Sequence, residues 1–247
     1  MEILSVNSVS KSFGNKKIIE NISLSLKKGE IISLLGVSGA GKTTLFNCIS
    51  GILNADCGTV LLNGNDITGK PGNISYMLQK DMLLAYKKII DNVSLPLLLS
   101  GKSKKQARSE AAEHFEEFGI AGTENMYPGE LSGGMRQRAA LLRTYLASSG
   151  VALLDEPFSA LDTITKSQMH RWYLSVMEKI DLSTIFITHD IDEAILLSDR
   201  VLILSGTPGK ITHEIRIDET HPRADNFNLT PQFLDYKKQI IEALGRI

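Results

Sequence analysis

The sequence predicts an α/β fold whose core is a mostly parallel β-sheet. Residues 30–36, EIISLLG, form a continuous apolar run of the kind that is buried on both faces of a parallel sheet. This run leads through a glycine-rich loop into a helical pattern at residues 42–53. From Ser132 onward strands and helices alternate, which predicts right-handed crossovers between parallel strands. The 247 residues suit one α/β domain, or one domain with an insertion, better than two domains.

The first part of the chain is predicted to form short strands. Residues 3–9 and 18–26 precede the run at 30–36, and turns at FGNKK and KKG separate the three strands. Residues 59–67, TVLLNGNDI, are typical of a hairpin with Asn63-Gly64 as its turn. We therefore expect an N-terminal antiparallel β subdomain beside the parallel core.

Residues 85–130 are expected to form a helical insertion. Ser103 and Gln106 make a capping box before a helix that is predicted to reach Phe118. Basic residues stand near its start and acidic residues near its end, an arrangement that opposes the helix dipole. We interpret these charges, Arg108 among them, as a solvated face. The side chains that must hold the helix by packing are Ala107, Ala111, Phe115 and Phe118.

The remaining elements follow from the alternation. We expect helices from Ser132 to about Ser148 and at 163–180 and 191–198, and strands at 151–155, 183–190 and 200–204. After a polar loop at 221–229, Thr230 is predicted to cap a last helix with Pro231 in its first turn. The apolar side of that helix carries Phe233, Ile240, Ile241 and Leu244.

Composition excludes several classes of protein. The formal net charge of −1 argues against a nucleic-acid binder that acts through bulk positive charge. No stretch approaches about 18 uncharged apolar residues, and the strand-like start with Glu2 is unlike a signal peptide. Without an export signal, Cys48 and Cys57 are expected to remain reduced thiols. We therefore expect a soluble, intracellular protein.

A phosphate-binding loop follows the buried strand. Residues 36–44, GVSGAGKTT, fit the pattern G-x-x-x-x-G-K-[ST] directly between a strand and a helix, the context of a P-loop NTPase. Glycines let backbone N–H groups wrap a β-phosphate, Lys42 can reach the β- and γ-phosphates, and the Thr43 hydroxyl can bind Mg²⁺. A glycine-rich turn with a surface lysine is the simpler alternative. The predicted ATP-binding residues are Gly36, Val37, Ser38, Gly39, Ala40, Gly41, Lys42, Thr43 and Thr44.

Two further strand ends carry polar groups. Asp155 ends the strand VALLD, where it can hold Mg²⁺, and Glu156 follows as the candidate general base for an attacking water. His189 follows the strand STIFIT and is expected near the γ-phosphate. An N-cap or a hydrogen-bond anchor would be the simpler role for such residues. The other histidines show no ligand spacing, so no further metal site is predicted: His114, His170, His213 and His221.

Residues 131–138, LSGGMRQR, predict a second anion-binding turn. The Ser132 hydroxyl and the backbone N–H groups of Gly133 and Gly134 stand at the start of a helix. One chain does not need two such turns for one ATP, but a dimer does if each turn closes the partner's site. A plain serine N-cap with flexible glycines is the alternative.

These motifs together resemble the ATP-binding subunit of ABC transporters over nearly the whole chain. The phosphate loop, Gln79 of YMLQ, LSGGMRQR, VALLDEP, the loop SALD at 159–162 and the histidine of ITHD occur in the family's order. The resemblance implies that Phe13 stacks on adenine, that Gln79 senses Mg²⁺ and water, and that Asp162 joins the two active sites. It also implies catalytic roles for Glu156, His189 and Lys42.

The resemblance implies a single ATP-binding domain over residues 1–247. Residues 1–84 and 136–210 would form the ATP-binding core, 85–135 the helical subdomain with the signature motif, and 211–247 the C-terminal tail helix. The stretch THDIDEAILLSDRVLILSGTPGKI is most similar to the importer group for nitrate, sulfonates and taurine, which includes carriers of thiamine pyrimidine precursors. Ala85-Tyr86 departs from that group, which often has Pro-Trp there.

The function expected from this resemblance is ATP hydrolysis that drives an importer of a small solute at the cytoplasmic face of the membrane. A second copy of the chain, transmembrane permease subunits and an extracytoplasmic solute-binding protein would be its partners, with ATP and Mg²⁺ and without nucleic acid. Two alternatives remain open: a soluble ABC ATPase of DNA repair or translation, and the ATPase subunit of an exporter.

Overall fold

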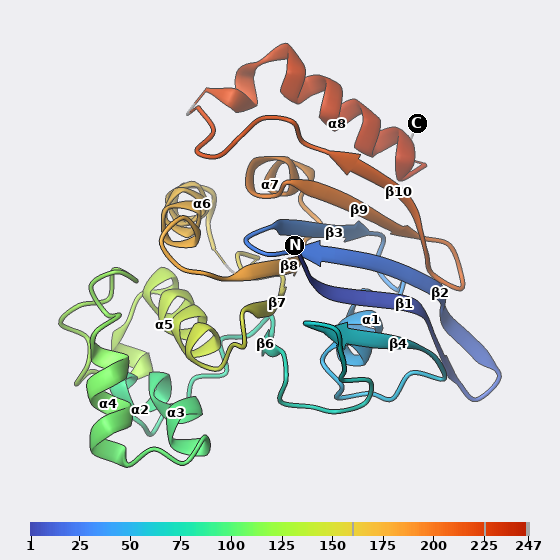
Figure 1. Ribbon diagram of the computed structural model, residues 1–247. Coiled ribbons are helices and arrows are strands. Elements are labelled where there is room, and N and C mark those ends of the chain that lie inside the picture. Colours follow the sequence, from blue (N-terminus) through green and yellow to red (C-terminus); the bar gives the residue numbers. More distant parts are fainter. Residues whose placement is uncertain (160, 225, 246–247) are drawn as a thin grey trace.

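The computed structural model describes residues 1–159, 161–224 and 226–245. Its strands form two sheets (Figure 1). The first has the order β2-β1-β4-β5 and is antiparallel, which confirms the predicted N-terminal subdomain. Its strands are β1 (Glu2–Phe13), β2 (Lys16–Lys27), β4 (Cys57–Leu62) and β5 (Asn65–Asp66).

The second sheet is the predicted parallel core. Its order is β10-β9-β3-β8-β7-β6, and only β10 runs antiparallel to its neighbour. Two of its strands were not predicted, because β6 is too short to show a period and β10 is a largely exposed edge strand. The strands are β3 (Ile31–Gly36), β6 (Ser75–Met77), β7 (Val151–Asp155), β8 (Ser183–Ile187), β9 (Arg200–Ser205) and β10 (Lys210–Arg216).

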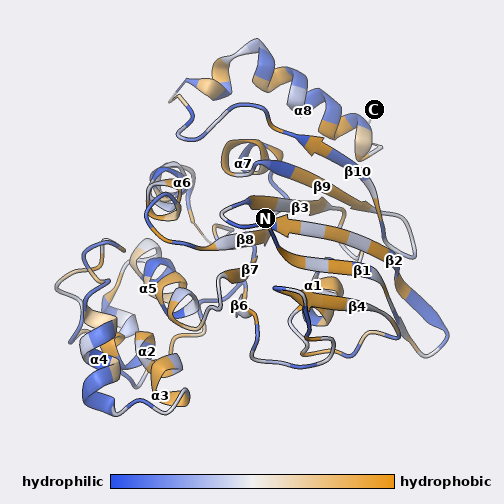
Figure 2. Ribbon diagram, viewed as in Figure 1, coloured by the Kyte–Doolittle hydropathy of each residue, from blue (hydrophilic) through white to orange (hydrophobic). Residues whose placement is uncertain are grey.

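Apolar cores cover both faces of β3, and all six of its residues are buried. Ile32 and Leu34 pack with α1 (Lys42–Ile49) and the antiparallel sheet. Leu35 packs with α7 (Ile191–Leu197) and α8 (Pro231–Ala243). Hydrophobic positions accordingly follow the core strands in Figure 2. The apolar run therefore forms a strand that is buried on both faces, as the sequence predicts.

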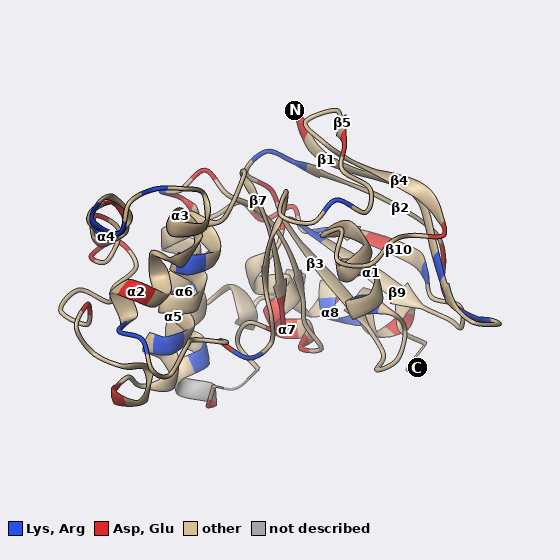
Figure 3. Cartoon of the chain, turned by 90° about the horizontal axis from the view of Figure 1, so that it is seen from below, with Lys and Arg blue, Asp and Glu red and all other residues tan. Residues whose placement is uncertain are grey.

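Helices α2–α6 form a group on one side of the sheets (Figure 3). The capping box of α4 is present, but α4 ends at Ala112, so the predicted extension to Phe118 is wrong. Beyond Ala112 the chain turns more tightly, with His114 N–H donating to Ala111 O (3.3 Å), and Gly119 at φ +64° ends the segment. The bounds are α2 (Ile89–Val93), α3 (Leu95–Leu99), α4 (Lys104–Ala112), η1 (Pro128–Glu130), α5 (Gly133–Leu146) and α6 (Thr163–Met177).

The charges on α4 do not form a purely solvated face. Arg108 donates two hydrogen bonds to Asp91 Oδ1 and one to Oδ2, at 2.7–2.9 Å, and thereby ties α4 to α2. The Asp91 side chain is 15% exposed, so this pair is partly shielded from water. The interpretation of Arg108 as a solvated charge is therefore wrong, since sequence spacing cannot show a partner on another helix.

The C-terminal helix begins as predicted. Thr230 Oγ1 accepts a hydrogen bond from Phe233 N–H (3.2 Å), and Pro231 occupies the first turn. Phe233 and Ile240 are buried against α7 and β10. Cys48 and Cys57 are free thiols. None of the helices in the described ranges is both long and apolar enough to cross a membrane.

Arg200, at the start of β9, joins the two sheets. Its Nε donates to Glu30 Oε1 (2.7 Å) and its Nη1 to Glu214 Oε1 on β10 (3.0 Å). Its Nη2 donates to the Ser25 carbonyl of β2. The Arg200 and Glu30 side chains are 11% and 10% exposed, so water cannot replace a missing partner.

We predict that Arg200→Met lowers the free energy of unfolding by about 3 kcal/mol, because it leaves the Glu30 carboxylate buried without its cation. Arg216→Met is the matched control. Arg216 also pairs with Glu214, but at 3.7 Å and with a 69% exposed side chain, so its loss should cost less than about 1 kcal/mol. Denaturant unfolding of both variants measures the difference, and equal losses would contradict the assigned role of Arg200.

Candidate active site

The phosphate loop connects β3 to α1 in a shape that requires glycine. Gly39 and Gly41 have φ of +81° and +97°, and Gly41 is the N-cap of α1. A Cβ on Gly41 would lie 2.6 Å from Ile19 Cγ2. The first N–H groups of α1 have no acceptor within the helix and point toward the loop, which makes this turn suitable for an anion.

The Lys42 side chain folds back onto the start of this loop. Its Nζ donates to the carbonyl oxygens of Gly36 (2.8 Å) and Val37 (3.2 Å). Burial lowers the pKa of Lys42, and the nearby Glu156 and Asp155 carboxylates oppose that shift. The loop borders a hollow of about 290 Å³, which is lined by Ile18, Ser38, Gly39, Gly41, Lys42, Thr43, Thr44, Asp155, Glu156 and Ile187.

Asp155, Thr43 and Tyr76 meet at the end of β7. Burial and the neighbouring Glu156 raise the pKa of Asp155, while hydrogen bonds from Tyr76 and Thr43 and the charge of Lys42 lower it. Tyr76 Oη lies 3.4 Å from Asp155 Oδ2, and its ring packs edge-on against Phe46 of α1. A carboxylate and a hydroxyl beside a phosphate loop form the oxygen donor set that Mg²⁺ prefers, so these residues fit the predicted ion.

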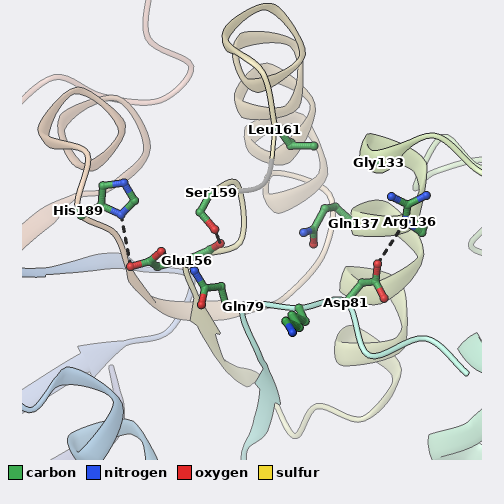
Figure 4. Close-up of a pocket in the computed structure, with 10 residues that line it drawn as sticks. Gln79, Asp81, Gly133, Arg136, Gln137, Glu156, Ser159, Leu161 and His189 are labelled. Atoms are coloured by element: carbon green, nitrogen blue, oxygen red, sulfur yellow. Dashed lines mark hydrogen bonds and ion pairs between the residues drawn. The ribbon is translucent and has the colours of Figure 1, made fainter. Parts of the chain in front are cut away.

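Glu156 is held between two polar side chains (Figure 4). Gln79 Nε2 donates to Glu156 Oε2 at 2.9 Å, and His189 Nδ1 lies 3.3 Å from Glu156 Oε1. Glu156 itself has φ +47°, which is uncommon for a residue with a side chain, and its N–H donates to Ile187 O (3.0 Å). Gln79 after β6, Glu156 after β7 and His189 after β8 therefore converge.

The signature turn lines a different hollow from the phosphate loop. Ser132 Oγ caps α5 by accepting from Met135 N–H (3.3 Å). Gly133 borders a second hollow of about 690 Å³ together with Gln79, Glu156 and His189. Glu156 is common to both hollows, but residues 132–134 do not line the one at the phosphate loop.

Phe13 and Asp162 are among the predicted residues that do not line these hollows. The Phe13 ring is 54% exposed, with Lys11 Nζ 5.8 Å from its centroid, so a flat ligand can reach it. Asp162 caps α6, since its carboxylate accepts hydrogen bonds from Thr165 N–H (3.1 Å) and Thr165 Oγ1 (2.6 Å). Ala160 of the predicted loop at 159–162 lies outside the described residues.

Several polar groups at the site are not predicted by the sequence. Tyr76 lies in β6, a strand that the sequence did not predict, so its contact with Asp155 could not be expected. Asp81 and Arg136 form an ion pair at 3.3 Å within the second hollow. Lys166 of α6 pairs with Asp190, next to His189, at 3.3 Å. These are contacts between distant segments, and neither spacing nor composition signals them.

No group of three or more His, Cys, Asp or Glu side chains that could hold a metal occurs in the described ranges. The three residues predicted to bind Mg²⁺ do not form one cluster. Thr43 and Asp155 lie together, whereas Gln79 is hydrogen-bonded to Glu156. Phosphate oxygens and water would have to complete the coordination, as is usual for Mg²⁺ with nucleotides.

The chain is similar in sequence to known ATP-binding proteins. A family model described as ABC transporter matches residues 19–159. The chain is 45% identical to the formylaminopyrimidine import ATP-binding protein ThiZ of Halalkalibacterium halodurans over 84% of its length and 81% of that protein. It is 37% identical to the aliphatic sulfonates import ATP-binding protein SsuB of Bacillus cereus (97% and 94%). It is 34% identical to the nitrate import ATP-binding protein NrtD of a Synechocystis species (94% and 89%).

Solved structures resemble the fold as well. A bacterial ABC transporter cassette solved as a dimer matches with a TM-score of 0.74 and 25% identity, over 88% of this chain and all of that one. A second dimeric structure, in a post-hydrolysis state with ADP and phosphate, matches with a TM-score of 0.73 at the same identity and coverage.

We predict that Tyr76→Phe raises the Mg²⁺ concentration needed for half-maximal ATP hydrolysis. The hydroxyl orients Asp155, and loss of such a support costs about 10-fold or more in metal affinity; the long 3.4 Å bond favours the lower end. Phenylalanine keeps the ring contact with Phe46. Tyr86→Phe, which changes an exposed ring, is the control and should leave the Mg²⁺ dependence unchanged. Identical Mg²⁺ curves for both variants would contradict this role.

Proposed function

We propose that this chain, which belongs to the ABC transporter family, binds and hydrolyses ATP to drive an importer of a small solute. The observation that supports ATP hydrolysis most directly is the Glu156 carboxylate, held between Gln79 and His189 at the opening of the phosphate-loop hollow. A γ-phosphate held by Lys42 would reach this opening, and a water there would lie beside both the phosphate and the Glu156 carboxylate.

ATP is the substrate in this mechanism. The residues that would hold its phosphates are Gly36 to Thr44, with the α1 N–H groups and Lys42 supplying positive charge. Mg²⁺, held by Thr43 and Asp155, would neutralise charge that develops on the phosphates. Glu156 would accept the proton of the attacking water, and His189 would keep the carboxylate oriented. Phe13 would stack on the adenine.

The complete site would require two chains. The signature residues 132–134 lie at the N-terminus of α5, away from the phosphate-loop hollow of the same chain. A second copy in opposite orientation would bring its own Ser132 and glycines to the γ-phosphate. Dimeric structures of similar cassettes support this arrangement. Asp162, which caps α6, would link the two sites.

The membrane partner would dock on the segment that follows Gln79. Met82 and Tyr86 are 56% and 76% exposed and therefore offer apolar surface there. The backbone beneath them is firmly held. Buried Asn92 accepts from Leu84 N–H (2.6 Å) and donates to the carbonyls of Leu84, Lys87 and Lys88 at 3.0–3.2 Å. A rigid turn with apolar side chains outward suits a transmembrane permease subunit.

The solute belongs to the range carried by the similar importers. Their names give a formylaminopyrimidine, aliphatic sulfonates and nitrate, so we propose a small anionic or heterocyclic solute. An extracytoplasmic binding protein would deliver it, and this chain would act at the cytoplasmic face of the membrane. Ala85-Tyr86 lies within the proposed docking surface, so the permease should carry a matching surface of its own.

We predict that Glu156→Gln slows ATP hydrolysis by about 10²–10⁴-fold while ATP binding persists, because the amide cannot accept the proton. ATP should then hold two copies of the variant together, and size-exclusion chromatography with and without ATP measures this. The double variant Lys42→Ala/Glu156→Gln is the control and should remain monomeric, since its phosphate loop lacks the cation. Hydrolysis by Glu156→Gln at the wild-type rate would show that Glu156 is not the base.

We also predict that a tagged chain, purified from detergent-solubilised native membranes, brings along a multi-span membrane protein that mass spectrometry identifies. Tyr86→Asp should reduce this recovery, because it places a charge on the proposed docking surface. Glu178→Ala, which changes an exposed residue just beyond the C-terminal end of α6, should leave this recovery unchanged. Recovery only from the soluble fraction, with ribosomal or DNA-associated proteins, would contradict the transporter function.

A further inference from the structure

An arginine of the signature helix contacts the loop that carries Gln79. Arg136 stands on the first turn of α5, and its Nε lies 3.3 Å from Asp81 Oδ2, two residues after Gln79 (Figure 4). Its Nη1 donates to the carbonyl of Leu131 at 2.7 Å, directly before Ser132. One guanidinium therefore touches both the Gln79 loop and the signature turn. We call Asp81 and Arg136 the clasp.

The Asp81 end of the clasp is fixed from several directions. Asp81 Oδ1 accepts from Leu83 N–H at 3.0 Å, which closes a local turn. Arg143, two turns further along α5, donates to the carbonyl of Asp81 and to that of Met82 (2.8 Å). The Gln79 loop is thus attached to α5 at three points, and a shift of the loop must move the start of α5 or break these contacts.

The clasp lies between the parts that would serve two different ATP molecules. Gln79 is hydrogen-bonded to Glu156, which lines the phosphate-loop hollow, so Gln79 would serve the ATP site of its own chain. Gly133 faces away from that loop into the larger hollow, which Asp81 and Arg136 also line. The Arg136 and Asp81 side chains are 37% and 28% exposed, so the pair adds little to folding stability. Its geometric effect is to set the distance between Gln79 and the signature turn.

We propose that Asp81 and Arg136 are positioning residues that couple the two ATP sites of a dimer through each chain. Occupation of one chain's phosphate loop displaces Gln79 from Glu156, and the clasp passes that displacement to Ser132 and its neighbours, which hold the partner's ATP. Arginine suits this task because its rigid planar fork presents several N–H donors in a fixed geometry, here toward Asp81 and the Leu131 carbonyl. The inference depends on the proposed ATP-dependent dimer.

The test measures ATP-dependent dimerisation of variants that also carry Glu156→Gln. Asp81→Arg and Arg136→Asp each bring like charges together, and each should raise the ATP concentration for half-maximal dimerisation by about 10-fold, a typical size for coupling between sites. The double variant Asp81→Arg/Arg136→Asp restores the attraction and should return the value to within about threefold of the parent, since the contacts with Leu131 and Leu83 stay lost.

Two measurements separate this role from a structural one. ATP binding to the single chain, at protein concentrations below dimer formation, and the thermal midpoint should both remain unchanged. Glu110→Arg is the matched control, because it reverses the Lys102–Glu110 pair, of similar exposure in the same group of helices, and should leave dimerisation unchanged.

The coupling role of the clasp would be contradicted by single variants that dimerise like the parent, or by a double variant that dimerises no better than the worse single variant. Either result would leave the proposed function intact. A parent that stays monomeric in ATP would overturn the shared site and the clasp together.

Discussion

The site depends on β3 being buried at the centre of a parallel sheet. Because β3 and β7 both pair in parallel with β8, their carboxyl ends meet at one edge, where Leu34 and Asp155 both lie opposite Ile187. β6 extends the same edge, with Met77 opposite Leu154. The phosphate loop, Gln79, Glu156 and His189 all follow these strand ends within a few residues. Main-chain hydrogen bonds, rather than contacts among the functional side chains, therefore bring the groups together.

Burial also sets the electrostatics of this edge. It lowers the pKa of Lys42 and raises that of Asp155, so each charged form needs the other nearby. Lys42 further donates to loop carbonyls, and Asp155 accepts from hydroxyl groups, so both charges are held in their working positions. A polyphosphate with a divalent cation can replace these internal partners at little cost in reorganisation, because it brings both an anion and a cation.

The helical group contributes in a different way. Its apolar core, around Phe115 and Phe118, is continuous with core-strand residues such as Leu154 and Phe186. The Gln79 loop is one connection between this helical unit and the phosphate-loop site. Arg136 and Arg143 attach that loop to α5, while Asn92 shapes the turn that follows it. A loop that is fixed to the helical unit at one end and to Glu156 at the other can transmit a small movement over a long distance.

The sequence by itself determined the fold class and the phosphate loop. Continuous apolar runs such as 30–36 and 151–155 are typical of strands buried on both faces, and the spacing of glycines with Lys42 and Thr43 has a specific phosphate geometry. These signals are local, so they survive without a structure. The resemblance of the ordered motifs to one family added the roles of Gln79 and residues 132–134, which the residues alone left open.

Only the tertiary structure decided which polar groups meet. The end of α4 at Ala112, the edge strand β10, the pairing of Arg108 with Asp91, the support of Asp155 by Tyr76 and the contact of Arg136 with Asp81 were not predicted correctly. Apart from the end of α4, which a local turn sets, each results from segments far apart in the chain that packing brings into register. A charged or hydroxyl side chain gives the same pattern in the sequence whether water or a distant partner satisfies it, and packing alone makes that choice.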